Sequence, residues 1–155
     1  MTSSQQLSKS ERINSKKLID RLFKGGGAKS MSAFPLRVVF MTEDADAHEP
    51  LAKMMVSVPK RYFKRAVKRN HVKRLVREAY RRNKQVLIDT LEAGEQRKAL
   101  SLCFIWTDGN LRSYEEVERK IANLLQRIAE KIGKDTAGET SLSPTQPVAE
   151  NTDQQ

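Results

Sequence analysis

The middle of the chain carries a strongly basic stretch, which runs Ala66-Val67-Lys68-Arg69-Asn70-His71-Val72-Lys73-Arg74-Leu75-Val76-Arg77. The wider segment from Lys60 to Lys84 holds 12 Lys or Arg residues and one acid, Glu78. On a helix with roughly 100° per residue, its polar side chains share an arc of about 140°: Arg69, Asn70, Lys73, Arg74, Arg77 and Arg81. Four apolar side chains share the opposite side: Val72, Leu75, Val76 and Ala79. The pattern predicts a helix with one face in a core and one cationic face.

The cationic face of this helix predicts a polyanionic partner. A solvated charged face normally mixes the two signs of charge, and this face does not. Phosphate groups suit it, because arginine binds phosphate in a bidentate manner and lysine acts as a point charge. Asn70 could donate to phosphate or sugar, or contact a base edge. A calmodulin-type or membrane-surface helix is a less favoured alternative, because the apolar side is needed against a sheet.

Apolar periodicity predicts further elements on both sides of the basic helix. We expect three strands with alternating apolar residues: Phe34–Met41, Leu51–Val58 and Leu100–Thr107. The first two strands could form a hairpin. We expect three helices: from Asn14 or Ser15 to Lys24, from Pro59 to about Leu91, and from a cap at Ser113 to about Ile132. Gly25-Gly26-Gly27 should end the first of these helices.

Length and composition indicate one folded domain with polar ends. The 155 residues carry a formal net charge of +10, and 38% of them are hydrophobic. We expect a disordered N-terminus at residues 1–10, an α+β domain at residues 11–133, and a disordered acidic tail at residues 134–155. No apolar run approaches the roughly 20 residues that span a bilayer, and the N-terminus is no signal peptide. A single cysteine, Cys103, excludes an intrachain disulfide and favours the cytoplasm.

Other chemical motifs are weak. Gly25-Gly26-Gly27-Ala28-Lys29-Ser30 lacks the Gly before Lys-Ser that a phosphate loop needs, so a helix stop is favoured. His48 and His71 have no metal-binding companions, and no catalytic set of side chains is visible. Cys103 and the aromatic residues are expected in the core rather than in stacking platforms: Phe40, Phe104 and Trp106.

The basic stretch resembles the signature helix of the bacterial ribonuclease P protein subunit. That family's pattern is Ala-Val-x-Arg-Asn-Arg-x-Lys-Arg-x-x-Arg, and the match covers five residues: Arg69, Asn70, Lys73, Arg74 and Arg77. The chain departs from the pattern at His71, where the family usually has Arg, and at Phe63, where it commonly has Gly. Val56-Ser57-Val58-Pro59-Lys60-Arg61 and Ser113-Tyr114-Glu115-Glu116 also resemble family segments. The resemblance spans about residues 12–130.

The resemblance implies a fold and a function. The fold would be a single α+β domain of order αβββαβα, with a mixed sheet packed on helices and a left-handed βαβ crossover, similar to ribosomal proteins. The holoenzyme would remove the 5′ leader of precursor tRNA, with catalysis by an RNA subunit that binds Mg²⁺. The partners would be ribonuclease P RNA and precursor tRNA, in the cytoplasm, with no membrane and no obligate protein partner.

The resemblance also implies two sets of site residues, neither of them catalytic or metal-binding. The set that would bind RNA comprises Lys60, Arg61, Arg65, Lys68, Arg69, Asn70, His71, Lys73, Arg74, Arg77 and Arg81. The set that would form a leader groove comprises Ile19, Phe23, Arg37 and Val39. Ile19 and Phe23 could equally be core residues.

Two other functions remain open at this point. One is a non-enzymatic protein that binds structured RNA, such as a ribosomal protein. The weaker one is a DNA-binding protein, since helix-turn-helix proteins rarely place their recognition helix between strands.

Overall fold

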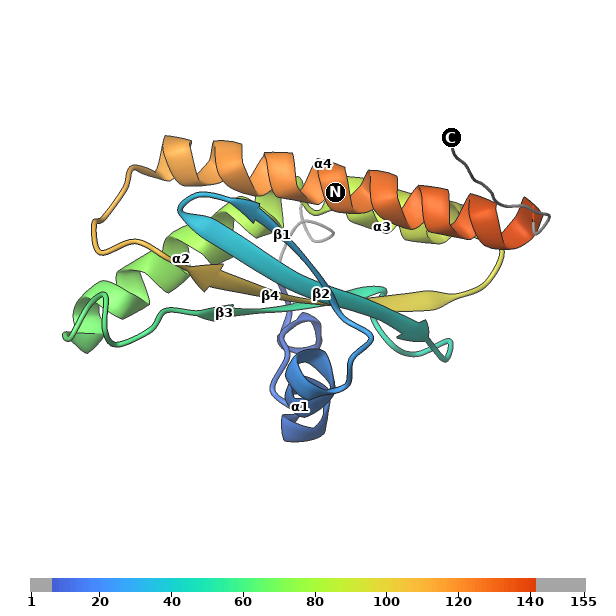
Figure 1. Cartoon of the computed structure of the whole chain (residues 1–155), viewed down its shortest axis with the longest axis horizontal. Helices are drawn as coiled ribbons and strands as arrows, with labels where there is room; N and C mark the ends of the chain where they lie inside the picture. The colour runs from blue at the N-terminus through green and yellow to red at the C-terminus, as the bar shows by residue number, and fades with distance from the viewer. Residues whose placement is uncertain (1–6, 142–155) are drawn as a thin grey trace, which may run out of the picture.

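The structure is a computed structural model that describes residues 7–141, with side chains described for residues 7–134. One mixed sheet separates a layer of three helices from a single short helix (Figure 1). In chain order the elements are η2 (Lys9–Glu11, a 3-10 helix), α1 (Lys16–Lys24), β1 (Lys29–Ala33), β2 (Leu36–Asp44), β3 (Ala52–Ser57), α2 (Ala66–Asn83), α3 (Gln85–Ala93), β4 (Lys98–Trp106) and α4 (Tyr114–Ser141). This confirms the predicted α+β domain.

The sheet has the strand order β1-β2-β4-β3. β4 pairs antiparallel with β2 and parallel with β3. The predicted hairpin between the strands near residues 34–41 and 51–58 is therefore wrong. β4 is buried along most of its length, and a strand buried on both faces belongs in the middle of a sheet. β3 and β4 are joined through α2 and α3, which makes the expected βαβ unit, and its left-handed sense stays a prediction.

The hairpin that does form joins β1 to β2, with Ala33 opposite Leu36. Strand β1 was missed by periodicity, since only Met31 and Ala33 of its five residues are apolar and none of the five is fully buried. Phe34 and Pro35 make the turn between the two strands. Phe34 is consequently 57% exposed, and the strand expected from Phe34 starts at Leu36.

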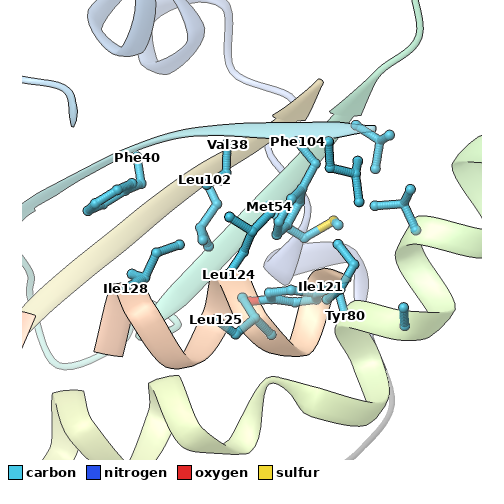
Figure 2. Close-up of a cluster of buried hydrophobic side chains, with 14 of the residues drawn as sticks. Val38, Phe40, Met54, Tyr80, Leu102, Phe104, Ile121, Leu124, Leu125 and Ile128 are labelled. Atoms are coloured by element: carbon cyan, nitrogen blue, oxygen red, sulfur yellow. The ribbon is translucent and has the colours of Figure 1, made fainter. Parts of the chain in front are cut away.

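The main core lies between the sheet and helices α2, α3 and α4. The even-numbered residues of β2 and β4 point into it, and Figure 2 shows Phe40, Leu102 and Phe104 of these strands together with Leu124 and Ile128 of α4. The core also contains Trp106, which is fully buried. The prediction that Phe40, Phe104 and Trp106 are core residues is confirmed.

The opposite face of the sheet is covered only where α1 crosses it (Figure 1). A smaller cluster joins the helix to the sheet there: Ile13, Leu18, Leu22, Val39, Met41 and Cys103. Cys103 is fully buried, as predicted, and burial raises the pKa of its thiol to about 12. Away from α1 this face remains open, and Arg37 on it is exposed.

Helix α2 is shorter than predicted. It starts at Ala66 rather than after Pro59, because the segment before Ala66 runs in turns and bends that bury Phe63 in the main core. It ends at Asn83, and α3 follows after Lys84. Lys84 is buried and forms an ion pair with Glu11, its Nζ lying 2.7 Å from a carboxylate oxygen.

The ends of the folded part extend further than predicted. Lys9 and Ser10, expected in the disordered N-terminus, form η2 together with Glu11. Helix α4 runs to Ser141, so residues 134–141 are helical and not part of a disordered tail. Gly133 within the helix costs only about 1 kcal/mol relative to Ala, which does not end a long helix. Residues 1–6 and 142–155, expected to be disordered, lie outside the described residues.

Candidate nucleic-acid interface

The predicted cationic face of α2 points to solvent. Val72, Val76 and Ala79 are fully buried on one side of the helix, as expected. On the other side four polar residues of the basic stretch are exposed, and Lys73 is half-buried among them: Lys68, Asn70, His71 and Arg74. None of these five side chains has a described ion pair with an acid within residues 7–134. The face therefore presents uncompensated positive charge.

The turn segment before α2 extends this face. Lys60, Arg61 and Arg65 are all exposed. The Arg61 guanidinium lies over the Tyr62 ring, 4.9 Å from its centroid, which limits the positions that the arginine can adopt. The three predicted residues of the segment thus lie at the N-terminal end of the cationic face.

Arg69 has a more structural position than the sequence indicated. Its Nη1 donates to the carbonyl oxygens of Phe63 and Lys64, at 2.8 Å each. The guanidinium thus ties the turn segment to the first turns of α2. Arg69 is half-buried, in contrast to the exposed cations beside it. One hydrogen-bonding edge of the side chain is used within the protein, so Arg69 orients the segment that carries Lys60, Arg61 and Arg65.

The C-terminal half of the cationic face borders a hollow of about 710 Å³. Arg74, Arg77 and Arg81 line it from α2, and Arg12 lines it from the N-terminal segment. Glu78 is also in the wall, and its carboxylate lies 2.6 Å from Nη2 of Arg81. Sequence reasoning missed Arg12, because no local pattern shows that its segment packs beside α2.

The second predicted site is a shallow hollow between α1 and the sheet. Phe23, Arg37 and Val39 line it together, as predicted, and its volume is about 220 Å³. The other lining residues are Leu22, Gly26, Ala28, Lys29 and Ser30. Phe23 is 48% exposed. Ile19 does not line this hollow and packs instead at the edge of the smaller apolar cluster.

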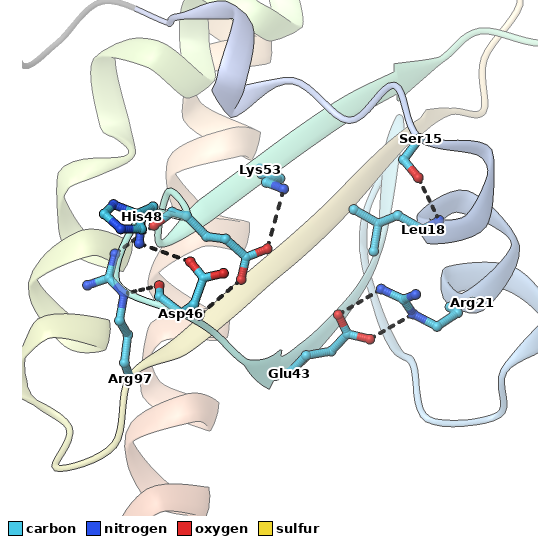
Figure 3. Close-up of polar contacts among 9 residues, drawn as sticks. Ser15, Leu18, Arg21, Glu43, Asp46, His48, Lys53 and Arg97 are labelled. Carbon is cyan, nitrogen blue, oxygen red and sulfur yellow. Dashed lines mark hydrogen bonds and ion pairs between the residues drawn. The ribbon is translucent and has the colours of Figure 1, made fainter.

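Helix α1 is held in place beside this hollow by polar contacts (Figure 3). Ser15 caps the helix, since its Oγ accepts from the backbone N–H of Leu18. Arg21 donates twice to the Glu43 carboxylate of β2, at 2.8 and 2.9 Å. At the end of the helix, a Cβ on Gly25 would lie 2.6 Å from the carbonyl oxygen of Arg21, and Gly26 has φ of 80°. The glycines thus end α1, as predicted.

The described residues hold no other site that the sequence left open. Within residues 7–134, no group of three or more His, Cys, Asp or Glu side chains could hold a metal ion. His48 is exposed in the loop after β2, as predicted. Among the described helices, none is long and apolar enough to cross a membrane.

Comparisons with known proteins agree with this fold and this basic helix. A family model described as Ribonuclease P matches residues 7–129. The chain is 42% identical over 123 residues to the ribonuclease P protein component of Porphyromonas gingivalis, covering 79% of this chain and 86% of that protein. It is 30% identical over 129 residues to the same component of Chlorobium phaeobacteroides, covering 79% of this chain and 87% of that protein.

Two solved structures share the fold. The RNase P protein of Thermotoga maritima superposes with a TM-score of 0.57 at 24% identity, over 76% of this chain and 96% of that one. The RNase P protein of Staphylococcus aureus gives a TM-score of 0.55 at 18% identity, over 79% of this chain and 97% of that one.

The family model and these relatives place the chain among small α+β proteins of RNA processing. More specifically, the chain belongs to the bacterial ribonuclease P protein component family. As a family member it is a protein component of an endoribonuclease holoenzyme with a role in tRNA processing.

Proposed function

We propose that the protein binds the RNA subunit of ribonuclease P through the cationic face of α2 and its preceding turn segment. The observation that carries the proposal is the row of exposed, uncompensated polar residues opposite a fully buried apolar face. A face of this kind binds a phosphate backbone by releasing counterions. Family membership favours this function over that of a ribosomal protein.

We further propose that the 5′ leader of precursor tRNA binds in the hollow between α1 and the sheet. Phe23 offers a half-exposed aromatic ring, and Arg37 offers an exposed guanidinium beside it. Stacking on an aromatic ring and contact with a cation are the two interactions that bind single strands independently of sequence. The hollow is shallow, which suits an extended strand better than a helical stem.

Catalysis in this proposal belongs to the RNA subunit. Among the described side chains, no group of three or more His, Cys, Asp or Glu could hold a metal ion. Mg²⁺ would be bound mainly by the RNA subunit and the substrate. The protein's part is to bind and orient the two RNAs. We also propose that it acts in the cytoplasm, since a chain with one buried thiol needs no oxidising compartment. No obligate protein partner is proposed.

The RNA-binding face is tested with alanine variants and RNA-affinity measurements across a salt series. Lys73→Ala should weaken binding of ribonuclease P RNA and lower the slope of log affinity against log salt by about 0.7–0.9, the value for one phosphate contact. Asn70→Ala should weaken binding with little change in slope, because it removes hydrogen bonds and no charge. Lys120→Ala on α4 is the control. Normal RNA affinity for both α2 variants, with a loss for Lys120→Ala, would place the site elsewhere.

The leader hollow is tested by charge reversal. Arg37→Glu should weaken binding of precursor tRNA to the holoenzyme more than binding of mature tRNA, because only the precursor has a leader. Arg119→Glu is the matched control, since Arg119 is exposed on α4 at the other face of the sheet. Equal losses for the two RNAs would reject a leader-specific site. RNA-free protein should not cleave precursor tRNA at all, and metal-dependent cleavage by it would contradict catalysis by the RNA.

A further inference from the structure

The hollow beside α2 is lined on one side by residues from the N-terminal segment of the chain. Arg12 and Leu7 belong to the N-terminal segment, while Arg74, Arg77 and Arg81 belong to α2. Four arginines from two separate segments therefore converge on one hollow. Its volume of about 710 Å³ is within the range of sites that hold molecules larger than a single ion.

The N-terminal segment is fixed in this position by the protein itself. The Ile13 N–H donates to the carbonyl oxygen of Met54 at 2.9 Å, and Arg12 forms a parallel bridge with the same residue. Just before it, Glu11 forms its ion pair with Lys84, whose side chain is only 5% exposed. The backbone of Arg12 is thus tied to β3 and to the end of α2. These contacts within the protein hold the Arg12 backbone beside α2 without a ligand.

The charge in the hollow is mostly uncompensated. Among the described lining residues Glu78 is the single acid, and its carboxylate pairs with Arg81. Within residues 7–134, no acid forms an ion pair with Arg12, Arg74 or Arg77. Burial lowers the pKa of Arg77, and the nearby charge of Arg12 lowers it further. An anion bound between these guanidiniums would reduce their mutual repulsion and stabilise their charged forms.

We propose that this hollow binds a short stretch of phosphodiester backbone and that Arg12 is one of its phosphate contacts. Three unpaired guanidiniums suit phosphate oxygens, which accept two parallel N–H donors from one arginine. With one phosphate bound, the hollow still has room for the adjoining sugar, which would lie against the apolar side chain of Leu7. This inference rests on the proposed RNA-binding function and extends the RNA contact beyond α2 to the N-terminal segment.

The first measurement uses inorganic pyrophosphate as the probe, titrated calorimetrically into the full-length protein at low salt. Arg12→Ala should weaken pyrophosphate binding about tenfold, the effect of losing one charge-assisted contact. Lys9→Ala is the matched control, because Lys9 is an exposed cation of the same segment that does not line the hollow. It should change the affinity by less than about twofold. Glu78→Gln should strengthen binding, since it removes the one carboxylate among the described lining residues of the hollow.

The second measurement is the affinity for ribonuclease P RNA across a salt series. Arg12→Ala should lower the slope by about 0.7–0.9, and Lys9→Ala should leave it unchanged. Arg12→Gln keeps most of the side-chain length and should give the same result with wild-type circular dichroism, which separates lost contact from lost folding.

The outcomes separate this inference from the proposed function. If Lys73→Ala weakens RNA binding while Arg12→Ala behaves like Lys9→Ala, the hollow is no RNA site and the function stands. If both Lys73→Ala and Arg12→Ala bind the RNA normally, the proposed RNA-binding function fails as well. If Arg12→Ala weakens pyrophosphate binding but leaves the slope of log RNA affinity against log salt unchanged, the hollow binds only a free anion. Its assignment to RNA is then overturned.

Discussion

Two ion pairs of nearly equal length but different burial give a sharp test of what holds the N-terminal segment in place. In Glu11–Lys84 the nitrogen and oxygen lie 2.7 Å apart, and the side chains are 16% and 5% exposed. In Arg21–Glu43 the distance is 2.8 Å, and the side chains are 52% and 38% exposed. Replacing one carboxylate by an amide in each pair isolates the effect of burial, because the amide keeps the shape of the acid.

Glu11→Gln should lower the free energy of unfolding by about 3 kcal/mol, since it removes the Glu11 carboxylate from its ion pair with the buried ammonium of Lys84. The value is at the low end of the usual range, because the terminal segment can move aside and admit water. For a domain of this size, a loss of about 3 kcal/mol corresponds to a fall in Tm of about 10 °C. Glu43→Gln should cost less than about 1 kcal/mol, as exposed pairs do.

Urea unfolding followed by circular dichroism measures both variants, and a thermal scan gives the two Tm values. A third variant checks the cause: Glu11→Leu combined with Lys84→Met removes both charges and should recover most of the stability that Glu11→Gln loses. Equal, small losses for Glu11→Gln and Glu43→Gln would refute the reasoning and show that Lys84 is solvated despite its small exposed area.

Three other outcomes are expected. The Cys103 thiol, with its pKa raised to about 12, should stay protonated and resist alkylation at pH 8 until the protein unfolds, and modification by iodoacetamide at the rate of a free thiol would contradict this. Arg69→Ala should speed amide hydrogen exchange in residues 60–65 and leave the core amides protected, because it removes the two bonds to the turn segment. Ending the chain after Lys134 should lower Tm by less than about 3 °C, since Ile132 is the last core residue among the described side chains, and a calorimetric loss above 10 °C would show that the end of α4 is needed for folding.

The helices could be predicted from the sequence because their signals are local. The apolar stripe of α2 and the glycines after α1 act within a few residues of where they stand. Strand pairing was not predictable in the same way. Nothing near Leu36–Asp44 or Ala52–Ser57 shows that a strand some fifty residues later inserts between them. The end of α4 was missed because Gly133 is a weak stop signal in a long helix.

The candidate-site residues that local patterns indicate were predicted, and those that depend on contacts between distant segments were missed. The exposed residues of α2 followed from helical periodicity, and Phe23, Arg37 and Val39 meet in one hollow as the resemblance implied. Arg12 was missed, because its place beside α2 depends on its pairing with Met54. The carbonyl partners of Arg69 were missed as well, since a charge pattern along a helix does not show which cations turn back to the backbone.

The central place of β4 has a consequence for how the chain is synthesised. The ribosome completes the strands β1, β2 and β3 before any residue of β4 exists, so the nascent sheet lacks its middle strand. During that interval β2 and β3 expose the edges that β4 later fills, and these edges are free to pair with each other or with another nascent chain. The sheet can close only after about residue 106 has left the exit tunnel. The time between the emergence of Ser57 and the emergence of Trp106 from the tunnel therefore sets how long this open-edged intermediate lasts.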